Sequence, residues 1–227
     1  FRLSSYEPDK VDEAFIAAFA LPRVRPHAHL AVQSGADPVL AAMGRRYGRD
    51  RVLEAVRALR AAKEDPFIGA DLIVGFPGET DRDAAATLEL AEECDFAWIH
   101  AFRFSPRPGT KAESMPGHVP ERIAGERASA LGDLARRGKR SYAARWVGAE
   151  LRAVLEESIG EDDDERISAA GSSASAPACA TSENYLKLRM RGVPELAQAG
   201  HAVACRIESA CPDSGQFDGN AVYLHNI

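Results

Sequence analysis

The sequence predicts an α/β protein followed by a small all-β domain. Up to about residue 104, predicted strands and helices alternate, which is how a parallel sheet, open or closed into a barrel, is built. The run Ile68–Phe76 is mostly apolar, as expected for a parallel strand that is buried on both faces. Later in the chain, short β-like runs separated by Gly and Pro are typical of a small β-barrel. We therefore expect a parallel α/β domain, its sheet open or closed into a barrel, over residues 1–118, a connecting helix over 119–147 and an all-β domain over 148–227.

The first predicted elements are the end of a strand at Phe1–Ser5 and a helix after Pro8. That helix has apolar residues on one face, namely Val11, Phe15, Ile16 and Phe19. A strand follows at His27–Gln33. Asp37 and Pro38 then form a helix start, with Asp37 as the N-cap and Pro38 at the first helical position.

The later elements of this domain have similar signals. A helix from about Asp50 places three apolar residues at helical spacing, namely Val52, Val56 and Leu59. Thr80 with Asp83 three residues later predicts a capping box at the start of a helix that runs to about Cys94. A strand is expected at Phe96–Phe104 and a long helix at Val119–Trp146.

The predicted all-β domain contains an insertion. Residues 160–183 are acidic and then rich in Ser and Ala, with no apolar period, so we expect a disordered segment there. The β-like runs around it are Leu151–Glu157, Tyr185–Met190, Ala202–Ile207 and Ala221–Leu224.

Composition limits the class of protein. The 227 residues are 45% hydrophobic and 27% charged, and no apolar run approaches the roughly 18 residues of a membrane span. The start at Phe1 has no signal-peptide pattern and predicts a cut within a strand. The net charge is −6, and five of the acidic residues lie together at positions 161–165. The four cysteines lack Cys-x2-Cys spacing, which favours a cytoplasmic protein without a zinc hairpin.

Charge near the domain junction leaves two interpretations open. Residues 119–152 contain eight Arg or Lys and four acidic residues, so this stretch is locally basic. A basic helix is compatible with RNA, because phosphate contacts depend on local charge. A solvated helix face explains the same pattern without a ligand.

A parallel sheet places its chemistry where the strands end at their carboxyl edge. The candidate segments are Ser4–Pro8, Gln33–Gly35, Gly75–Glu79 and Ser105–Thr110. The turn Gly75-Phe76-Pro77-Gly78 leads into a helix N-terminus, where glycine lets a ligand approach the backbone and an anionic group is favoured. A plain strand-to-helix turn is the alternative.

Polar side chains around these strand ends are the candidate ligand contacts. Glu7, Gln33 and Glu79 could hydrogen-bond ribose hydroxyls or an amino group, or serve only in loop solvation and helix capping. Arg103 and Arg107 flank a Pro-stiffened loop that could clamp a phosphate or carboxylate, and surface ion pairing is the alternative.

Two further patterns have both a functional and a structural explanation. Tyr185, Lys187 and Arg189 recur at alternate positions, which suits stacking on a base and phosphate contact, or a charged edge strand. His27 and His29 share one face of a strand. No third metal ligand is evident nearby, so structural histidines are the preferred interpretation.

Taken in order, five motifs resemble the second half of the radical S-adenosylmethionine (SAM) barrel of tRNA methylthiotransferases, and the β-rich end resembles their RNA-holding TRAM domain. The motifs are Arg2–Pro8, His29–Gly35, Met43–Tyr47, Asp71–Thr80 and Phe104–Thr110. The segments His100–Phe104 and Met115–Pro120 resemble the threonylcarbamoyladenosine-type branch more than the isopentenyladenosine branch.

The resemblance implies methylthiolation of the adenosine beside the anticodon in certain tRNAs, with SAM and two [4Fe-4S] clusters as cofactors. It implies that Ser5 and Glu7 lie near the ribose or amino acid part of SAM. It further implies that Gln33, Gly75, Phe76, Pro77 and Gly78 line the SAM site. Arg103, Arg107, Tyr185, Lys187 and Arg189 are the candidate substrate or RNA contacts.

The sequence departs from the family pattern at the cluster-binding motif and at one position of the His29–Gly35 motif. The Cys-x3-Cys-x2-Cys cluster motif is absent from the sequence, and Ala31 replaces the Pro that is usual in the His29–Gly35 motif. We therefore expect no catalytic or cluster-binding residue in this chain, a missing N-terminal half as its partner, and no activity in isolation. A non-catalytic tRNA-binding module, working through the β-domain and the basic helix, is the alternative.

Overall fold

The computed structural model describes residues 1–156, 178–191, 193, 197–210 and 217–221. It divides into two compact units, Phe1–Tyr142 and Ala143–Ile227. No helix in the described ranges is both long and apolar enough to cross a membrane.

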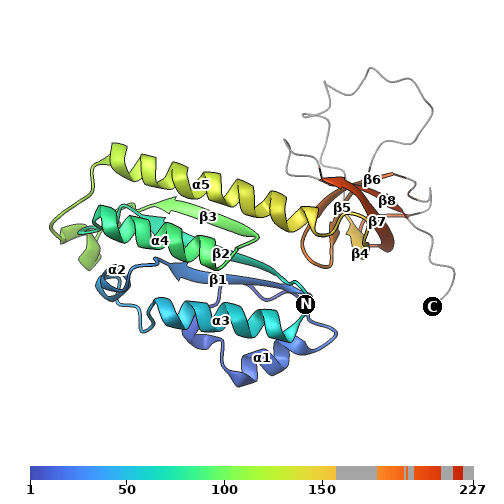
Figure 1. Ribbon diagram of the computed structural model, residues 1–227, viewed down its shortest axis with the longest axis horizontal. Coiled ribbons are helices and arrows are strands. Elements are labelled where there is room, and N and C mark those ends of the chain that lie inside the picture. The colour runs from blue at the N-terminus through green and yellow to red at the C-terminus, as the bar shows by residue number, and fades with distance from the viewer. Residues whose placement is uncertain (157–177, 192, 194–196, 211–216, 222–227) are drawn as a thin grey trace, which may run out of the picture. The chain divides into compact units, whose positions relative to one another are not determined.

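The first unit is an α/β structure with a three-stranded parallel sheet in the order β1-β2-β3 (Figure 1). Its elements are η1 (Pro8–Lys10), α1 (Glu13–Ala20), β1 (His27–Gln33), α2 (Asp37–Ala42), α3 (Arg49–Ala62), β2 (Phe67–Val74), α4 (Asp81–Glu93), β3 (Trp98–Arg103), η2 (Lys111–Ser114) and α5 (Glu121–Ala144). The parallel sheet confirms the predicted α/β class of this part. The strand expected at Phe1–Ser5 is reduced to a single parallel bridge between Tyr6 and Leu30.

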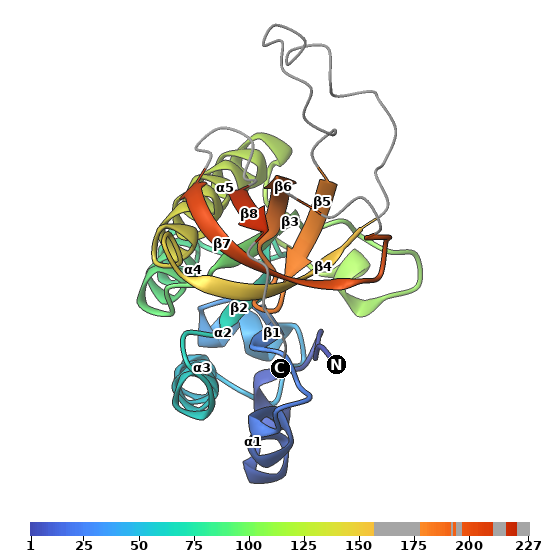
Figure 2. The ribbon, with the colours of Figure 1, turned by 90° about the vertical axis from the view of Figure 1, so that its right-hand side faces the viewer.

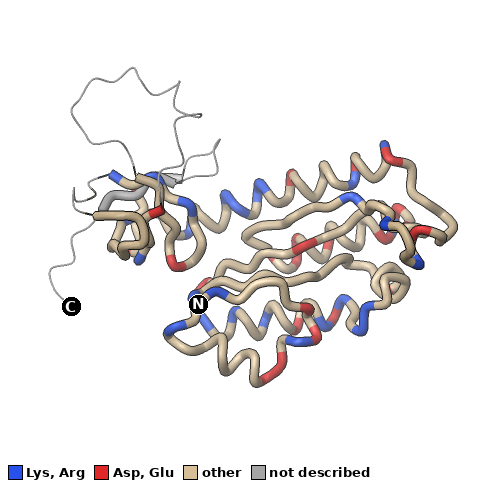
Figure 3. The backbone as a smooth tube through the Cα atoms, turned by 180° about the vertical axis from the view of Figure 1, so that it is seen from behind, with Lys and Arg blue, Asp and Glu red and all other residues tan. Residues whose placement is uncertain are grey.

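The core lies between the sheet and its helices. Every second residue of each strand points into it, as strand geometry requires, and Leu30, Leu72 and Ile99 are at most 3% exposed. The helices α3, α4 and α5 cover this face, whereas the view from behind shows the strands without helices in front of them (Figure 3). One face of the sheet is therefore packed, and among the described residues the other is left open.

Two helix starts show how local chemistry sets the elements. The capping box between Thr80 and Asp83 is confirmed, with the Thr80 side chain accepting from the Asp83 backbone N–H. The role predicted for Asp37 is wrong, because Ala36 is the N-cap of α2. The Asp37 carboxylate instead accepts from the Arg49 backbone N–H at 2.7 Å. It thus caps α3, whose own N-cap, Gly48, has no side chain to do so.

The long helix α5 is more than a connector. Five of its residues are buried, and two of these, Leu131 and Ala135, belong to the core under the sheet; the others are Ala124, Tyr142 and Ala143. Tyr142, 1% exposed, donates from its hydroxyl to the Asp65 carbonyl at 2.8 Å. Almost the whole of the helix that was expected to connect the two domains therefore packs as a layer of the first unit.

The second unit is a small closed barrel with strand order β4-β5-β6-β8-β7 (Figure 2). Its strands are β4 (Glu150–Leu155), β5 (Ala178–Ser182), β6 (Lys187–Arg191), β7 (Ala202–Ala210) and β8 (Phe217–Ala221). Neighbouring strands are antiparallel except β6 and β8, which are parallel. Inward residues such as Leu151, Leu188 and Ile207 are at most 7% exposed.

The predicted limits of the insertion and of one strand need correction. Ala178–Ser182 forms strand β5, although its small and polar residues lack an apolar run, because pairing with β4 and β6 satisfies its backbone. Tyr185 precedes β6 in a turn with φ +69° and so is not part of the strand. The acidic run at 161–165 and the predicted strand residues 222–224 lie outside the described residues.

Candidate functional site

The three turns at the carboxyl edge of the sheet meet in one small apolar cluster. Ala36 follows β1, Phe76 follows β2 and Phe104 follows β3, and the Phe76 and Phe104 ring centroids are 5.1 Å apart. Parallel strands end at a common edge. The sheet therefore brings the Gln33, Gly75–Gly78 and Ser105 segments together, as the sequence predicts for a site.

The turn after β1 is fixed by α4. Gly35 donates from its backbone N–H to the Thr87 hydroxyl at 3.0 Å, and the Ser34 and Thr87 hydroxyls are 3.2 Å apart. A Cβ on Gly35 would lie 2.5 Å from the Ala86 carbonyl oxygen, so only glycine fits there. Gln33, 8% exposed, has φ +69°, a strained conformation for a residue that is not glycine. The structure thus holds Gln33 in an unfavourable backbone state at a predicted ligand edge.

The turn after β2 needs its two glycines. Gly75 and Gly78 have φ of +79° and +83°, a region that side chains disfavour. A Cβ on Gly75 would also lie 2.7 Å from the Ala124 Cβ of α5. Phe76 and Pro77 are buried. The Gly78 N–H donates to the Gly117 carbonyl at 2.8 Å and the Phe76 carbonyl accepts from the Glu79 N–H at 2.9 Å, so the turn is held by backbone hydrogen bonds within the chain.

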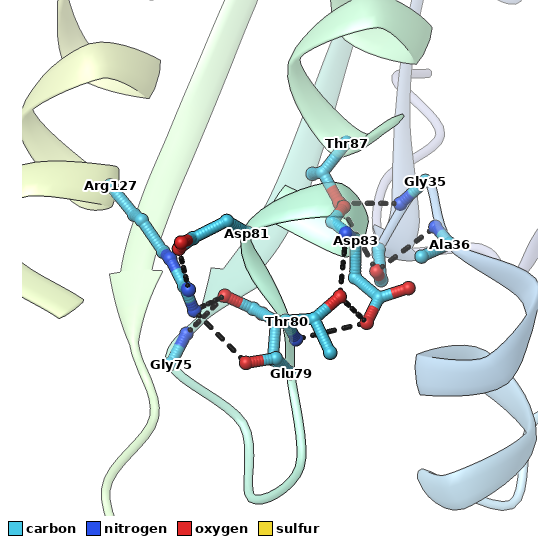
Figure 4. Close-up of polar contacts among 10 residues, drawn as sticks. Gly35, Ala36, Gly75, Glu79, Thr80, Asp81, Asp83, Thr87 and Arg127 are labelled. Carbon is cyan, nitrogen blue, oxygen red and sulfur yellow. Dashed lines mark hydrogen bonds and ion pairs between the residues drawn. The ribbon is translucent and has the colours of Figure 1, made fainter. Parts of the chain in front are cut away.

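A buried ion pair closes the same turn (Figure 4). The Glu79 carboxylate accepts from the Gly75 backbone N–H at 3.0 Å and from the Arg127 guanidinium at 2.6 Å. The Glu79 side chain is 1% exposed and the Arg127 side chain 12%. Arg127 also contacts the exposed Asp81 carboxylate at 2.6 Å. Glu79 therefore serves as an internal anchor of the turn.

The charges of this network have an electrostatic consequence. Burial by itself lowers the pKa of the Arg127 guanidinium, because it disfavours the charged form. The hydrogen bond to Asp81 and the charge of Glu79 outweigh that effect, so the pKa of Arg127 is raised above its ordinary value. Arg127 thus stays charged, and it links α5 to the turn after β2.

An open pocket of about 550 Å³ lies beside this network. It is bounded by Gly75, by the end of β3 with the following loop, and by the start of α5. Arg103 lines it and forms an exposed ion pair with Glu121 at 3.3 Å. Arg107 does not line it and is exposed. The two predicted arginines therefore do not form one clamp in this structure.

Ser5 and Glu7 lie on the segment that runs beside β1. Ser5 is exposed with φ +61°, and the Glu7 carboxylate forms an ion pair with Arg45. Both Glu7 and Arg45 line a pocket of about 210 Å³. The structure thus gives Glu7 a partner from the Met43–Tyr47 motif that the sequence did not indicate.

The predicted RNA-contacting residues of the barrel differ in their surroundings. Tyr185 is 41% exposed. The Lys187 amine lies 2.7 and 3.0 Å from the two Glu156 carboxylate oxygens and 2.8 Å from the Thr181 hydroxyl. Arg189 is half-buried on the same outward face of β6. Lys187 must therefore exchange an existing ion pair before it can contact a phosphate.

The described cysteines are unsuited to hold a cluster. Cys94 lies in the first unit, and Cys179 and Cys205 lie in the second. Burial raises the pKa of the Cys94 thiol to about 12 and that of Cys205 to about 11. Metal binding requires the thiolate, which such environments disfavour.

Sequence reasoning missed two residues that organise the edge. Thr87 appears as an ordinary polar residue within a helix, and Arg127 as one charge of a basic helix. Helical spacing could have indicated both residues. Thr87 is three residues before the buried Leu90, and Arg127 is four residues before the buried Leu131, so both lie on the inner faces of their helices.

Residues 8–91 match the family described as the Radical SAM superfamily. The threonylcarbamoyladenosine tRNA methylthiotransferase MtaB of Treponema pallidum (strain Nichols) is 51% identical over 158 residues, which is 70% of this chain and 33% of the relative. The protein of the same name from Thermotoga maritima is 45% identical over 156 residues, 68% of this chain and 36% of the relative.

A relative with a different printed activity is also similar. The tRNA-2-methylthio-N(6)-dimethylallyladenosine synthase of Thermobifida fusca (strain YX) is 42% identical over 164 residues, 72% of this chain and 33% of the relative. The chain therefore spans about a third of the length of these curated relatives. The resemblance stated from the motifs is confirmed.

Proposed function

We propose that this chain, which belongs to the threonylcarbamoyladenosine-type branch of the radical SAM methylthiotransferases, is part of an enzyme that methylthiolates threonylcarbamoyladenosine beside the anticodon of tRNA. The observation that carries this proposal is the 51% identity with a relative of that printed name over 158 residues. The structure supports it by gathering the motif turns at one sheet edge, where α/β proteins bind ligands.

The residues at this edge fit a nucleoside-type ligand such as SAM. Gln33 is held in a strained conformation, and Gly75 of the following turn lines an open pocket. We assign Gln33, Gly75, Phe76, Pro77 and Gly78 to the SAM site, with Phe76 and Pro77 supporting the turn from within. Ser5 and Glu7 are assigned to its ribose or amino acid side. Bound at this edge in the whole enzyme, and reduced by one electron from a cluster, SAM would supply the carbon radical that abstracts hydrogen from the base.

The residues present do not fit an iron–sulfur cluster. The sequence lacks Cys-x3-Cys-x2-Cys, and the described cysteines are separated between the units. We infer that both [4Fe-4S] clusters of the family are held by residues outside these 227. This chain alone is therefore expected not to cleave SAM reductively, which an assay for 5′-deoxyadenosine with a chemical reductant checks.

The second unit is assigned to tRNA binding as a TRAM-like barrel. Its closed five-stranded form, the exposed Tyr185 and the outward Lys187, Arg189 and Arg191 of β6 support this role. Basic residues also gather toward the carboxyl end of α5 (Figure 3). Stacking and phosphate contact together are how single-stranded RNA is held.

The deciding experiment is nucleoside analysis of tRNA from cells in which the gene encoding this chain is deleted. Loss of 2-methylthio-threonylcarbamoyladenosine, restored by the intact gene, is expected. Loss of the dimethylallyladenosine product instead would assign the chain to the other branch, and unchanged nucleosides would overturn the proposal.

A non-catalytic tRNA-binding module remains the second candidate, because the barrel and the basic helix end need no cofactor. Titration of the 227-residue chain with tRNA at several salt concentrations tests it. Affinity that falls steeply with salt and is indifferent to SAM supports direct phosphate contact. The gene-deletion result then decides whether binding serves a modification.

A further inference from the structure

We propose that His29, Asp71 and His100 form a binding site for a first-row divalent cation such as Zn²⁺ or Co²⁺, on the open face of the parallel sheet. This inference goes beyond the proposed function, because it uses none of the residues assigned there to SAM or tRNA. The three residues come from three neighbouring strands, β1, β2 and β3.

Strand register places the three side chains together. His29 pairs with Gly69, and Asp71, two residues further along β2, pairs with His100. Residues two apart on a strand point to the same face. That face is opposite to the core, because the alternating residues Leu30, Leu72 and Ile99 are the ones buried under the helices.

The potential ligand atoms converge. The His29 Nε2 lies 2.9 Å and the His100 Nδ1 3.2 Å from the same Asp71 Oδ1, and all three atoms lie within 4.8 Å of one another. Ligands about 2.0–2.1 Å from one ion are separated by roughly 3–4 Å. The two nitrogen-to-oxygen separations, 2.9 and 3.2 Å, are already at or close to that spacing.

Neighbouring residues leave room for the His29 imidazole and pack against the His100 imidazole. A Cβ on Gly69 would lie 2.6 Å from the His29 Nδ1, so glycine is what leaves room for this imidazole. The Trp98 and Phe102 rings contact the His100 ring edge-on, with centroids 6.1 and 6.2 Å away. The site is therefore partly pre-organised before any ion binds.

The donor set indicates the class of ion. Two imidazole nitrogens and one carboxylate oxygen suit Zn²⁺ and neighbouring first-row ions, and leave coordination positions open on the exposed side. Ca²⁺ and Mg²⁺ prefer oxygen ligands and are not favoured here. In the metal-free chain, the Asp71 carboxylate accepts hydrogen bonds from one N–H of each ring. Binding an ion at these nitrogens requires each neutral ring to move its hydrogen to the other nitrogen, a change of tautomer that releases no proton overall.

The test is a titration of the 227-residue chain with Co²⁺, carried out without a histidine tag and after chelator dialysis. The expected result is one Co²⁺ per chain with visible ligand-field absorption, and competition by Zn²⁺. His100→Ala lies on the edge strand with a half-exposed side chain, so it spares the fold and should weaken binding by more than about 100-fold. Asp71→Asn should also weaken it.

The control variant is His201→Ala, which removes an exposed histidine from the second unit and should bind Co²⁺ as the parent chain does. Circular dichroism of each variant separates loss of ligand from loss of fold. The proposal is overturned by an absence of stoichiometric binding, by binding that survives His100→Ala, or by a sulfur-to-cobalt charge-transfer band that indicates cysteine ligation. In the first case the three residues are only a hydrogen-bonded group.

Discussion

The turn after β2 and the outward face of β6 use similar charged residues in opposite settings. In the turn, the Glu79–Arg127 pair is almost fully buried, with side chains 1% and 12% exposed. On β6, the Lys187–Glu156 pair has side chains 47% and 40% exposed. Desolvated charges must be paired, whereas exposed pairs exchange readily with water and ions. The first pair therefore defines a rigid turn, and the second leaves its lysine available to another anion.

The largest expected effect comes from breaking the buried pair. Arg127→Met leaves the Glu79 carboxylate buried without its cation and should destabilise the first unit by about 3–5 kcal/mol. Urea unfolding followed by the helical circular dichroism signal measures this, since the described helices belong to that unit apart from the last residues of α5.

Two further variants sharpen this first test. Combining Glu79→Gln with Arg127→Met should recover much of the loss, because the unpaired charge is removed. Arg122→Met breaks an exposed pair with Glu126 and should cost no more than about 0.5 kcal/mol. Equal losses for Arg122 and Arg127 would contradict the distinction between buried and exposed pairs.

A second test concerns packing of the turn after β1. Gly35→Ala places a methyl group within 2.5–2.6 Å of backbone atoms of α4, and should destabilise the first unit by roughly 3 kcal/mol. The control, Gly125→Ala on α5, has no atom within 4 Å of the added Cβ and should stabilise by about 0.5–1 kcal/mol. A neutral Gly35→Ala variant would show that this edge is more plastic than described.

A third test uses pH. His27 is buried, and burial, with lesser contributions from Arg2 and His29, lowers its pKa from 6.5 to about 4. The unfolded chain therefore binds the proton more readily, and stability falls as pH drops from about 6.5 toward 4, by about 2 kcal/mol at pH 5. His27→Gln should flatten this part of the urea-unfolding profile. The fall in unfolding free energy between about pH 6.5 and 4 should be unchanged in His118→Gln, which removes an exposed histidine of the same unit.

The smallest effect is expected on the exposed pair of the barrel. Glu156→Gln should change stability by no more than about 1 kcal/mol. It should strengthen tRNA binding at low salt, because Lys187 no longer exchanges partners. Lys187→Gln should weaken tRNA binding. It should also reduce the slope of log affinity against log salt concentration by about one. A rise in tRNA affinity for Lys187→Gln would remove this face from the proposed interface.

Most of the first unit could be predicted from its sequence, because the apolar periods and caps are local. The capping box at Thr80, the strand at His27–Gln33 and the buried face of α3 all follow from neighbouring residues. Asp37 was misassigned because its hydrogen bond reaches the start of the next helix, twelve residues along the chain. Strand β5 was missed because its residues become a strand only through pairing.

The site was predicted as segments but not as contacts. That the turns of Gln33 and Gly75 meet follows from a parallel sheet, which strand pattern alone indicates. The partners Arg127 of Glu79 and Arg45 of Glu7 are 48 and 38 residues away, and no local pattern selects them among many arginines. The two residues that lie beside His29, Asp71 and His100, likewise follow only from the register of three strands.

The close approach of Gly69 to His29 has a consequence for the evolution of the family. A chain that acquires a side chain at position 69 cannot keep an imidazole at position 29 in this orientation, since the added carbon would lie 2.6 Å from its ring nitrogen. Substitutions at the two positions should therefore be inherited together among relatives. Relatives that retain histidine at positions 29 and 100 should therefore also retain glycine at position 69 of β2.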